Sequence, residues 1–273
     1  MEKRAGFVME GYCPVNNGNL YYEISGREPW LVFIHGAWTS HKWWRWIIPE
    51  FSDRFGTLSF DLRGHGKSSK LKSPFSVEGF ARDLDELLSY HNIFDCVLIG
   101  WSLGGSIAMQ YSIDHPQKIK GQVLISTRSK KDVKMKLEAR LFEVLTQFRL
   151  VSFENGLKKR FQRMLQQETS GVIADWAIKE LLNNSRADFF RIAASFLDWN
   201  LTKDLSTVRI PSLVICGEKD SLVPKKFSEQ IYRELPLAKL FLIRGCDHTV
   251  ILDRPADVCK AVKEFIHEIK FDS

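Results

Sequence analysis

Three residues that lie far apart in the chain, Ser102, Asp220 and His248, have types and surroundings suited to acyl transfer. Ser102 is the centre of a Gly-x-Ser-x-Gly pentapeptide (100–104), which follows an apolar run and leads directly into an apolar helical pattern. A serine hydroxyl becomes an effective nucleophile when it is exposed, held still and deprotonated by a base. A sharp strand-to-helix turn provides exposure and rigidity, and it aims the N–H of Leu103 at the negative oxygen formed during acyl transfer. We therefore predict Ser102 as the nucleophile and Leu103 as one oxyanion donor.

The base and the acid that such a serine needs are predicted in the C-terminal part of the chain. An imidazole must accept the serine proton, and a carboxylate must fix the imidazole tautomer. Asp220 and His248 each follow an apolar, strand-like run. The order serine, aspartate, histidine is expected when all three lie at the carboxyl ends of parallel strands. Glu218 and Asp247 remain as rival acids, and Asp247 is disfavoured because it adjoins the histidine in sequence.

A second oxyanion donor is predicted at the end of an earlier apolar run, residues 31–34. The run ends in His35-Gly36, and a backbone N–H after a strand-end glycine can face the reacting carbonyl. Removing one such donor typically raises the barrier by ~2.7 to 4 kcal/mol. We predict the N–H of Ala37 as this donor, with that of Trp38 as the alternative, and a structural role for His35.

Tryptophans are concentrated just after this glycine, at Trp38, Trp43, Trp44 and Trp46. Two interpretations stay open. The side chains pack a first helix on the sheet, or they form an apolar wall for an acyl group beside the oxyanion donors. In the second case we expect Trp38 and Trp101 to bind the substrate.

These segments need a scaffold that brings them together, and the chain alternates between strand-like runs and helical patterns. The strand-like runs are residues 7–13, 20–24, 30–34, 57–60, 96–99, 122–125, 212–216 and 239–243, and the helical patterns are 77–91, 103–115, 226–235 and 256–269. The later runs are continuously apolar, as in parallel strands that are buried on both faces. We predict an α/β fold with a doubly wound, mostly parallel sheet, preceded by an antiparallel hairpin.

Residues 128–205 interrupt this alternation. They contain no strand-like run, only helical stretches at 133–150, 153–167, 172–182 and 187–199. One crossover needs only about a dozen residues. We therefore predict a helical cap at 128–205, inserted into a core formed by residues 1–127 and 206–273.

The net charge of +6 is concentrated in this insertion. Residues 128–168 hold eleven Lys and Arg against five Asp and Glu, so the rest of the chain is neutral overall. Such a concentration indicates either an anionic partner or a solvated helical face with interleaved charges.

The composition is that of a soluble globular protein, with 44% apolar and 26% charged residues. No apolar run approaches the ~18 to 20 residues of a membrane span, and no apolar stretch of a secretory signal follows the charged N-terminus. We expect a cytoplasmic protein with no membrane span and no nucleic-acid partner. The five cysteines are scattered, which favours neither a disulfide framework nor a zinc cluster, and no metal or other cofactor is implied.

Taken together, these motifs resemble the α/β-hydrolase family. The residues that carry the resemblance occur in the family's order: His35-Gly36, the Asp-Leu-Arg-Gly-His-Gly-Lys-Ser loop at 61–68, the serine pentapeptide, the Asp220 loop and His248. The resemblance covers the core, and the helical insertion matches the place where the family carries its cap. Relatives that open epoxides or displace halide have an aspartate where this chain has Ser102, so those activities are not expected.

Within the serine branch, the Gly-Trp-Ser-Leu-Gly-Gly sequence and the basic cap look like carboxylesterases that act on pimeloyl groups of acyl carrier protein. This resemblance implies that cap cations engage the acidic carrier: Arg140, Arg149, Lys158, Lys159, Arg160 and Arg163. The expected function is hydrolysis of small carboxylic esters or thioesters through an acyl-enzyme. Alternatives are a carrier-protein methyl ester esterase, a carbon–carbon bond hydrolase or peptidase with the same triad, and a non-catalytic binding module.

Overall fold

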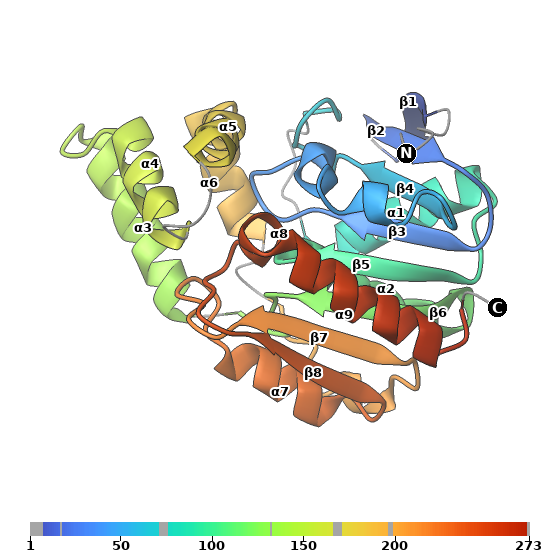
Figure 1. Ribbon diagram of the computed structural model, residues 1–273. Helices are drawn as coiled ribbons and strands as arrows, with labels where there is room; N and C mark the ends of the chain where they lie inside the picture. Colours follow the sequence, from blue (N-terminus) through green and yellow to red (C-terminus); the bar gives the residue numbers. More distant parts are fainter. Residues whose placement is uncertain are drawn as a thin grey trace.

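The computed structural model describes residues 8–16, 18–70, 76–131, 133–165, 171–195 and 199–271, and eight strands among them form one sheet (Figure 1). The strands are β1 (Val8–Val15), β2 (Gly18–Ser25), β3 (Trp30–Ile34), β4 (Gly56–Phe60), β5 (Cys96–Trp101), β6 (Ile119–Ile125), β7 (Ser212–Gly217) and β8 (Ala238–Ile243). Their order in the sheet is β1-β2-β4-β3-β5-β6-β7-β8. β2 pairs antiparallel with both β1 and β4. All the other neighbouring strands pair parallel. The predicted fold class is confirmed, and only residue 7 of the predicted strands lies outside the described residues.

Helices cover both faces of the sheet (Figure 1). α1 (Val77–Tyr90), α2 (Leu103–Asp114) and α7 (Lys226–Glu234) pack on one face, and α9 (Pro255–Glu268) packs on the other beside the 3-10 turn η1 (His41–Trp44). The shorter elements are η2 (Ile48–Glu50), η3 (Pro116–Lys118), η4 (Leu205–Thr207) and α8 (Val250–Asp253). The four predicted core helices are therefore present.

Successive side chains of the central strands point to opposite faces, and both faces are buried. In β3, Val32 and Ile34 join the core under α1 and α2, while Leu31 and Phe33 join the core under α9. All four are fully buried. This double burial explains why the strand reads as a continuous apolar run rather than as an alternation with polar residues.

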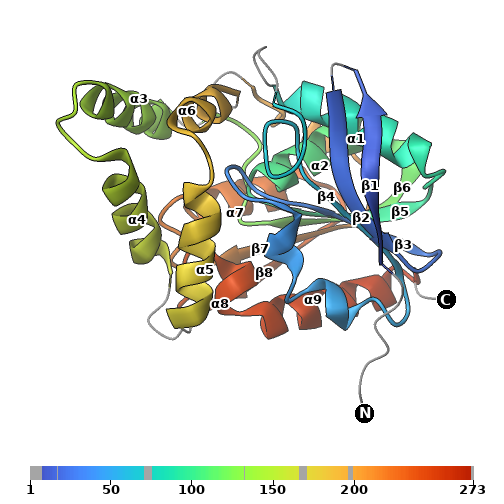
Figure 2. The same cartoon turned by 90° about the horizontal axis from the view of Figure 1, so that it is seen from above.

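Four helices lie between β6 and β7 in the chain: α3 (Val133–Gln147), α4 (Phe153–Met164), α5 (Gly171–Leu182) and α6 (Arg186–Ser195). We call them the helical segment. α3 and α4 lie farthest from the sheet, with α5 and α6 between them and the sheet (Figures 1 and 2). The four predicted helical stretches are confirmed, although residues 166–167 and 196–198 of those stretches lie outside the described residues. The division into a core and a separate cap stays a prediction.

All five cysteines are buried, and none of them forms a disulfide bond. Burial raises the pKa of Cys96 to about 12 and that of Cys216 to about 11. These thiols therefore behave as small core side chains. In the part of the chain that is described, no helix is both long and apolar enough to cross a lipid bilayer.

Candidate active site

Ser102 occupies a strained turn between β5 and α2. Its φ of +53° and ψ of −115° lie outside the regions that non-glycine residues ordinarily adopt. Two glycines permit this turn because strand and helix approach closely. A Cβ at Gly104 would lie 2.0 Å from the carbonyl oxygen of Ile34, and one at Gly100 would lie 2.3 Å from that of Gly104. The pentapeptide spacing is therefore a steric requirement of the turn that presents the serine.

The structure brings the three predicted side chains together. The Ser102 hydroxyl lies 3.0 Å from His248 Nε2, and His248 Nδ1 lies 2.9 Å from Asp220 Oδ2. The other Asp220 oxygen accepts hydrogen bonds from the N–H groups of Leu222 (3.0 Å) and Val223 (2.7 Å). Because the carboxylate is held by these two amides, it fixes Nδ1 of the imidazole as the protonated nitrogen and leaves Nε2 free to accept the serine proton.

The two rival carboxylates have other hydrogen-bond partners. Asp247 accepts from the backbone N–H groups of Ser221 and of His248 itself, both at 2.7 Å. Glu218 accepts from the backbone N–H of Gly245 at 3.0 Å. Both side chains thus stabilise the loops that carry Asp220 and His248.

A small hollow of about 30 Å³ lies beside Ser102, with Ala37 and Leu103 in its wall. Leu103 is the first residue of α2, so its N–H has no partner within the helix. The predicted oxyanion donors thus border the same space as the hydroxyl. Gly36 permits this proximity, because a Cβ there would lie 3.2 Å from that of Ser102 and closer still to the ring of Trp101.

The orientation of the Ala37 N–H follows from the other end of the same peptide unit. The carbonyl oxygen of Gly36 accepts hydrogen bonds from His35 Nδ1 and Thr39 Oγ1, each at 2.7 Å. In a trans peptide the N–H points away from the carbonyl, so the Ala37 N–H points away from both donors. The backbone N–H of Leu62 donates to His35 Nε2 at 2.9 Å, which places the imidazole proton on Nδ1.

His35 has this structural role as a neutral side chain. It is fully buried, and burial lowers its pKa to about 4. The ring of His65 packs edge-on against it at 5.1 Å, and burial lowers the pKa of His65 to about 3. Both histidines are therefore uncharged at neutral pH.

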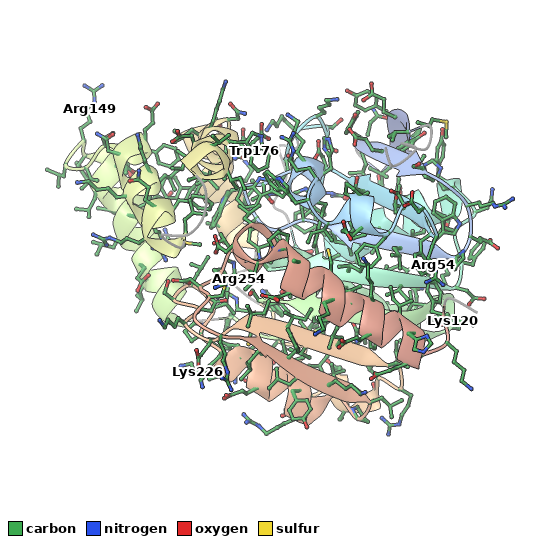
Figure 3. All side chains as sticks on the ribbon, in the orientation of Figure 1. Arg54, Lys120, Arg149, Trp176, Lys226 and Arg254 are labelled. Atoms are coloured by element: carbon green, nitrogen blue, oxygen red, sulfur yellow. The ribbon has the colours of Figure 1, made fainter. Side chains whose placement is uncertain are left out.

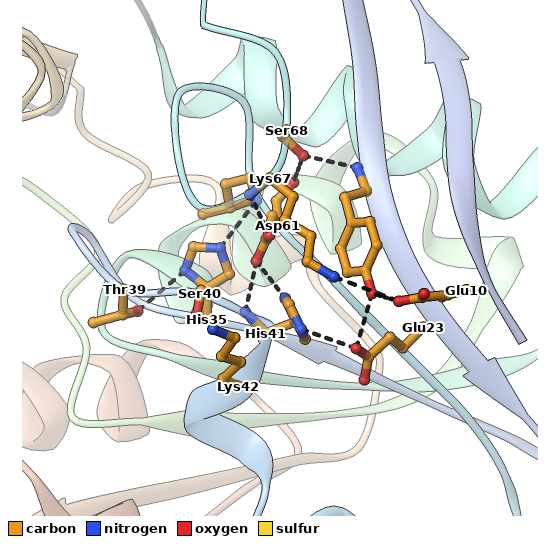
Figure 4. A network of polar contacts seen from close by, with 12 residues as sticks. Glu10, Glu23, His35, Thr39, Ser40, His41, Lys42, Asp61, Lys67 and Ser68 are labelled. Atoms are coloured by element: carbon orange, nitrogen blue, oxygen red, sulfur yellow. Dashed lines mark hydrogen bonds and ion pairs between the residues drawn. The ribbon is translucent and has the colours of Figure 1, made fainter. Parts of the chain in front are cut away.

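A charged network supports the loops behind this peptide (Figure 4). His41 lies between two carboxylates, with Nδ1 2.7 Å from Asp61 and Nε2 3.0 Å from Glu23. Burial disfavours the charged imidazole, but the hydrogen bonds to the two carboxylates outweigh it and raise the pKa of His41 to about 9. Asp61 also accepts from the backbone N–H groups of His41 and Lys67, both at 2.8 Å. No sequence motif indicates these roles of His41 and Thr39.

Trp38 connects the loop that carries Ala37 to the helical segment. Its φ of +64° is unusual for a bulky residue. The indole stacks on Phe189 of α6 at 4.3 Å and donates Nε1–H to the Phe189 carbonyl at 3.0 Å. Asn184, in the turn between α5 and α6, donates to the carbonyl of Trp38 at 2.7 Å. No sequence pattern signals Asn184 or Phe189, because their partner lies nearly 150 residues away.

A larger cavity of about 380 Å³ extends from Ser102 and His248 into the helical segment. Its wall is mostly apolar and includes Trp38, Trp101, Leu157, Phe161, Met164 and Phe189. Both tryptophans expected at a substrate site therefore line the cavity, whereas Trp43 and Trp44 are fully buried in the core.

Three of the six cations singled out in the sequence also line this cavity: Lys159, Arg160 and Arg163. Arg160 pairs with Glu138 at 3.3 Å.

Within the described residues, no group of three or more His, Cys, Asp or Glu side chains is placed to hold a metal ion. Around Ser102 the structure places a hydroxyl, an imidazole and a carboxylate within hydrogen-bond distance of one another, beside a mostly apolar cavity.

Residues 29–255 match the family described as alpha/beta hydrolase fold. The chain belongs to the α/β-hydrolase fold family. The resemblance found in the sequence is thereby confirmed, and membership in the family supports the expectation of a hydrolase.

Similar proteins include proline iminopeptidase PfmaB of Pestalotiopsis fici, which is 26% identical over 284 residues, spanning 95% of this chain and 100% of the relative. A pimeloyl-[acyl-carrier protein] methyl ester esterase of Edwardsiella ictaluri is 25% identical over 243 residues, spanning 86% of this chain and 92% of the relative. Among solved structures, a thermophilic esterase from Thermogutta terrifontis has a TM-score of 0.85 at 20% identity, covering 96% of this chain and 99% of that chain. The last similarity concerns the fold alone.

Proposed function

We propose that this α/β-hydrolase is a serine hydrolase of carboxylic esters or thioesters, with Ser102, His248 and Asp220 as its catalytic residues. The observation that carries the proposal is the pair of hydrogen bonds joining hydroxyl, imidazole and carboxylate, at 3.0 Å and 2.9 Å. A binding protein with the same fold has no need of this alignment. The 30 Å³ hollow beside the hydroxyl supports the further assignment of Ala37 and Leu103 as oxyanion donors.

In the first half of the reaction, the Ser102 oxygen attacks the ester carbonyl carbon while His248 Nε2 takes the hydroxyl proton. The carbonyl oxygen becomes negative and accepts hydrogen bonds from the N–H groups of Ala37 and Leu103. Asp220 stabilises the imidazolium that forms. When the carbon–oxygen bond to the alcohol breaks, the imidazolium gives its proton to the departing oxygen, and the acyl group stays on Ser102.

In the second half, a water molecule repeats the attack. His248 takes one proton from this water as its oxygen bonds to the acyl carbon, and the same two amides hold the new oxyanion. The bond to Ser102 then breaks, and the imidazolium returns the proton to the serine oxygen. The products are an alcohol and a carboxylic acid, and the enzyme regains its starting protonation state.

The cavity next to Ser102 favours a substrate whose acyl part is apolar. Its wall near Ser102 is formed by aromatic and aliphatic side chains, and its volume of about 380 Å³ is in the range of small-molecule sites. Lys159 and Arg163 on the same wall support a second candidate, an acyl group carried by an acidic protein, as in the relative named as an acyl-carrier methyl ester esterase.

The test of the serine mechanism is labelling with a fluorophosphonate probe, together with hydrolysis of p-nitrophenyl esters of short and long acids. We expect labelling of the wild type and none of Ser102→Ala, whose ester turnover should fall by a factor on the order of 10⁶. Ser112→Ala, at a buried serine of α2 that lines neither cavity, is the matched control and should still be labelled. Labelling that persists in Ser102→Ala would contradict the proposal.

The substrate class is tested by adding a prolyl p-nitroanilide and a carrier-bound acyl methyl ester to the panel. Faster cleavage of the anilide would replace the esterase assignment with a peptidase acting through the same triad. Turnover of the carrier substrate that falls with salt, and falls further in a Lys159→Ala Arg163→Ala double variant, would favour the carrier-directed enzyme.

A further inference from the structure

Helix α3, which lies with α4 farthest from the sheet (Figures 1 and 2), carries apolar side chains that are exposed to solvent. On α3, Leu137, Leu141, Val144 and Phe148 just after it are 65%, 60%, 45% and 68% exposed. Their spacing of four, three and four residues places them in one row along the helix. We call these four residues the apolar stripe. A contiguous exposed apolar row of this kind is typical of a surface that binds another protein or a membrane.

The stripe is not needed to attach α3 to the rest of the protein. A different side of the helix carries Phe142, whose ring lies 5.9 to 6.4 Å from the rings of Phe153, Phe189 and Phe190. These contacts hold α3 on the helical segment, so the stripe is an additional apolar surface.

The segment that carries the stripe has an excess of positive charge, although α3 also bears Glu138 and Glu143. Residues 128–168 contain the whole excess of positive charge in the protein. Arg140 on α3 is exposed, and Arg149, just beyond the helix, extends from the outer end of the molecule (Figure 3). Two copies of this chain that met through their stripes would bring two cationic segments together, which is unfavourable. A lipid bilayer with anionic headgroups has an apolar interior and a negatively charged surface, and so it matches both features.

The chain leads directly from the stripe to the wall of the large cavity, which also includes Phe142 of α3. Leu150 and Val151 follow Phe148 in the chain and are 70% and 38% exposed, and Val151 also lines the cavity that contains Ser102. An apolar path therefore runs from α3 to the candidate active site.

We propose that α3 docks this protein on an anionic lipid surface. The apolar stripe enters the headgroup region, and Arg140 and Arg149 pair with lipid phosphates. The helix lies on the surface and does not cross it, and the cavity faces the lipid beside Val151. This docking is independent of the proposed hydrolase chemistry.

The test is co-sedimentation of the full chain with vesicles of phosphatidylglycerol and phosphatidylcholine in equal parts, compared with vesicles of phosphatidylcholine alone. We expect binding to the anionic vesicles that weakens with added salt. Leu141→Glu and Phe148→Glu should each bind at least about tenfold more weakly, because each puts a charge where an apolar side chain would enter the lipid. Leu237→Glu is the matched control, since Leu237 is 51% exposed and lies before β8, away from the helical segment, and it should bind like the wild type.

Melting temperatures of the three variants, which do not depend on any enzymatic assay, should equal that of the wild type. The proposal is overturned if wild type does not sediment with anionic vesicles, or if Leu237→Glu loses as much binding as Leu141→Glu. It is also overturned if wild type is a dimer on gel filtration that Leu141→Glu converts to a monomer, because the stripe would then be an interface between copies.

Discussion

Acidification should weaken the fold through His35, the residue that hydrogen-bonds the peptide of the proposed oxyanion hole. Burial lowers its pKa from the ordinary 6.5 to about 4. Between these two values the unfolded chain binds a proton at this histidine and the folded protein does not, so stability is lost as pH falls through this window. The loss from this residue is about 2 kcal/mol between pH 7 and pH 5, and about 3 kcal/mol in total, at about 1.4 kcal/mol per unit of pKa shift.

The variant that isolates this contribution is His35→Asn. The asparagine amide can still donate to the Gly36 carbonyl, but it does not titrate in this range. Urea unfolding followed by tryptophan fluorescence at pH 7 and pH 5 gives the free energy of unfolding of both proteins. The variant should be less stable at pH 7, because it does not accept the Leu62 N–H, yet its further loss on acidification should be about 2 kcal/mol smaller than that of the wild type.

The comparison is specific because the carboxylates and histidines that do not neighbour His35 titrate alike in both proteins and cancel in the difference. His267→Asn, at an exposed position on α9, is the matched control and should show the pH dependence of the wild type. An equal pH-dependent loss in His35→Asn and wild type would refute the neutral, buried state of His35 and, with it, the tautomer that fixes the Ala37 N–H.

Three further results are expected. Gly104→Ala should destabilise the protein by about 3 kcal/mol or more, measured by thermal unfolding, because the new Cβ would lie 2.0 Å from a backbone oxygen of β3; an unchanged melting temperature would contradict the close approach. Asn184→Ala should lower kcat for ester hydrolysis about tenfold at nearly unchanged KM, by releasing the Trp38 carbonyl, while Asn183→Ala should not. The stability that the ion pairs of His41 contribute is complete below its ordinary pKa of 6.5 and is lost as pH rises through about 9. Urea unfolding should show that His41→Gln loses less stability between pH 7 and pH 10 than the wild type does.

The sequence predicts the elements well because their signals are local. Continuous apolar runs of four to six residues are typical of strands buried on both faces, and the structure contains a strand at each predicted position. The pentapeptide around Ser102 is just as local, since its glycines are required by contacts at a single turn. Chain order then placed Asp220 and His248 at the ends of later strands.

The choice among acids needed the tertiary structure. Glu218, Asp220 and Asp247 all lie in loops after β7 and β8. The sequence favours Asp220 and disfavours Asp247, which adjoins His248, but it leaves both other carboxylates as rivals. The backbone of the folded loop separates them, because two amides hold Asp220 against His248 while Asp247 accepts from the backbone of the histidine beside it.

The supporting contacts of the proposed oxyanion hole also depend on packing between distant segments. Leu62 reaches His35, and Asn184 reaches Trp38, only once β3, β4 and the helical segment are assembled. A hydrogen bond between residues far apart in sequence leaves no periodic signal, because either partner alone is an ordinary loop residue. The sequence thus determined the type of each element and which groups are candidates for the reaction, whereas the protonation, orientation and support of those groups were decided by how the elements pack.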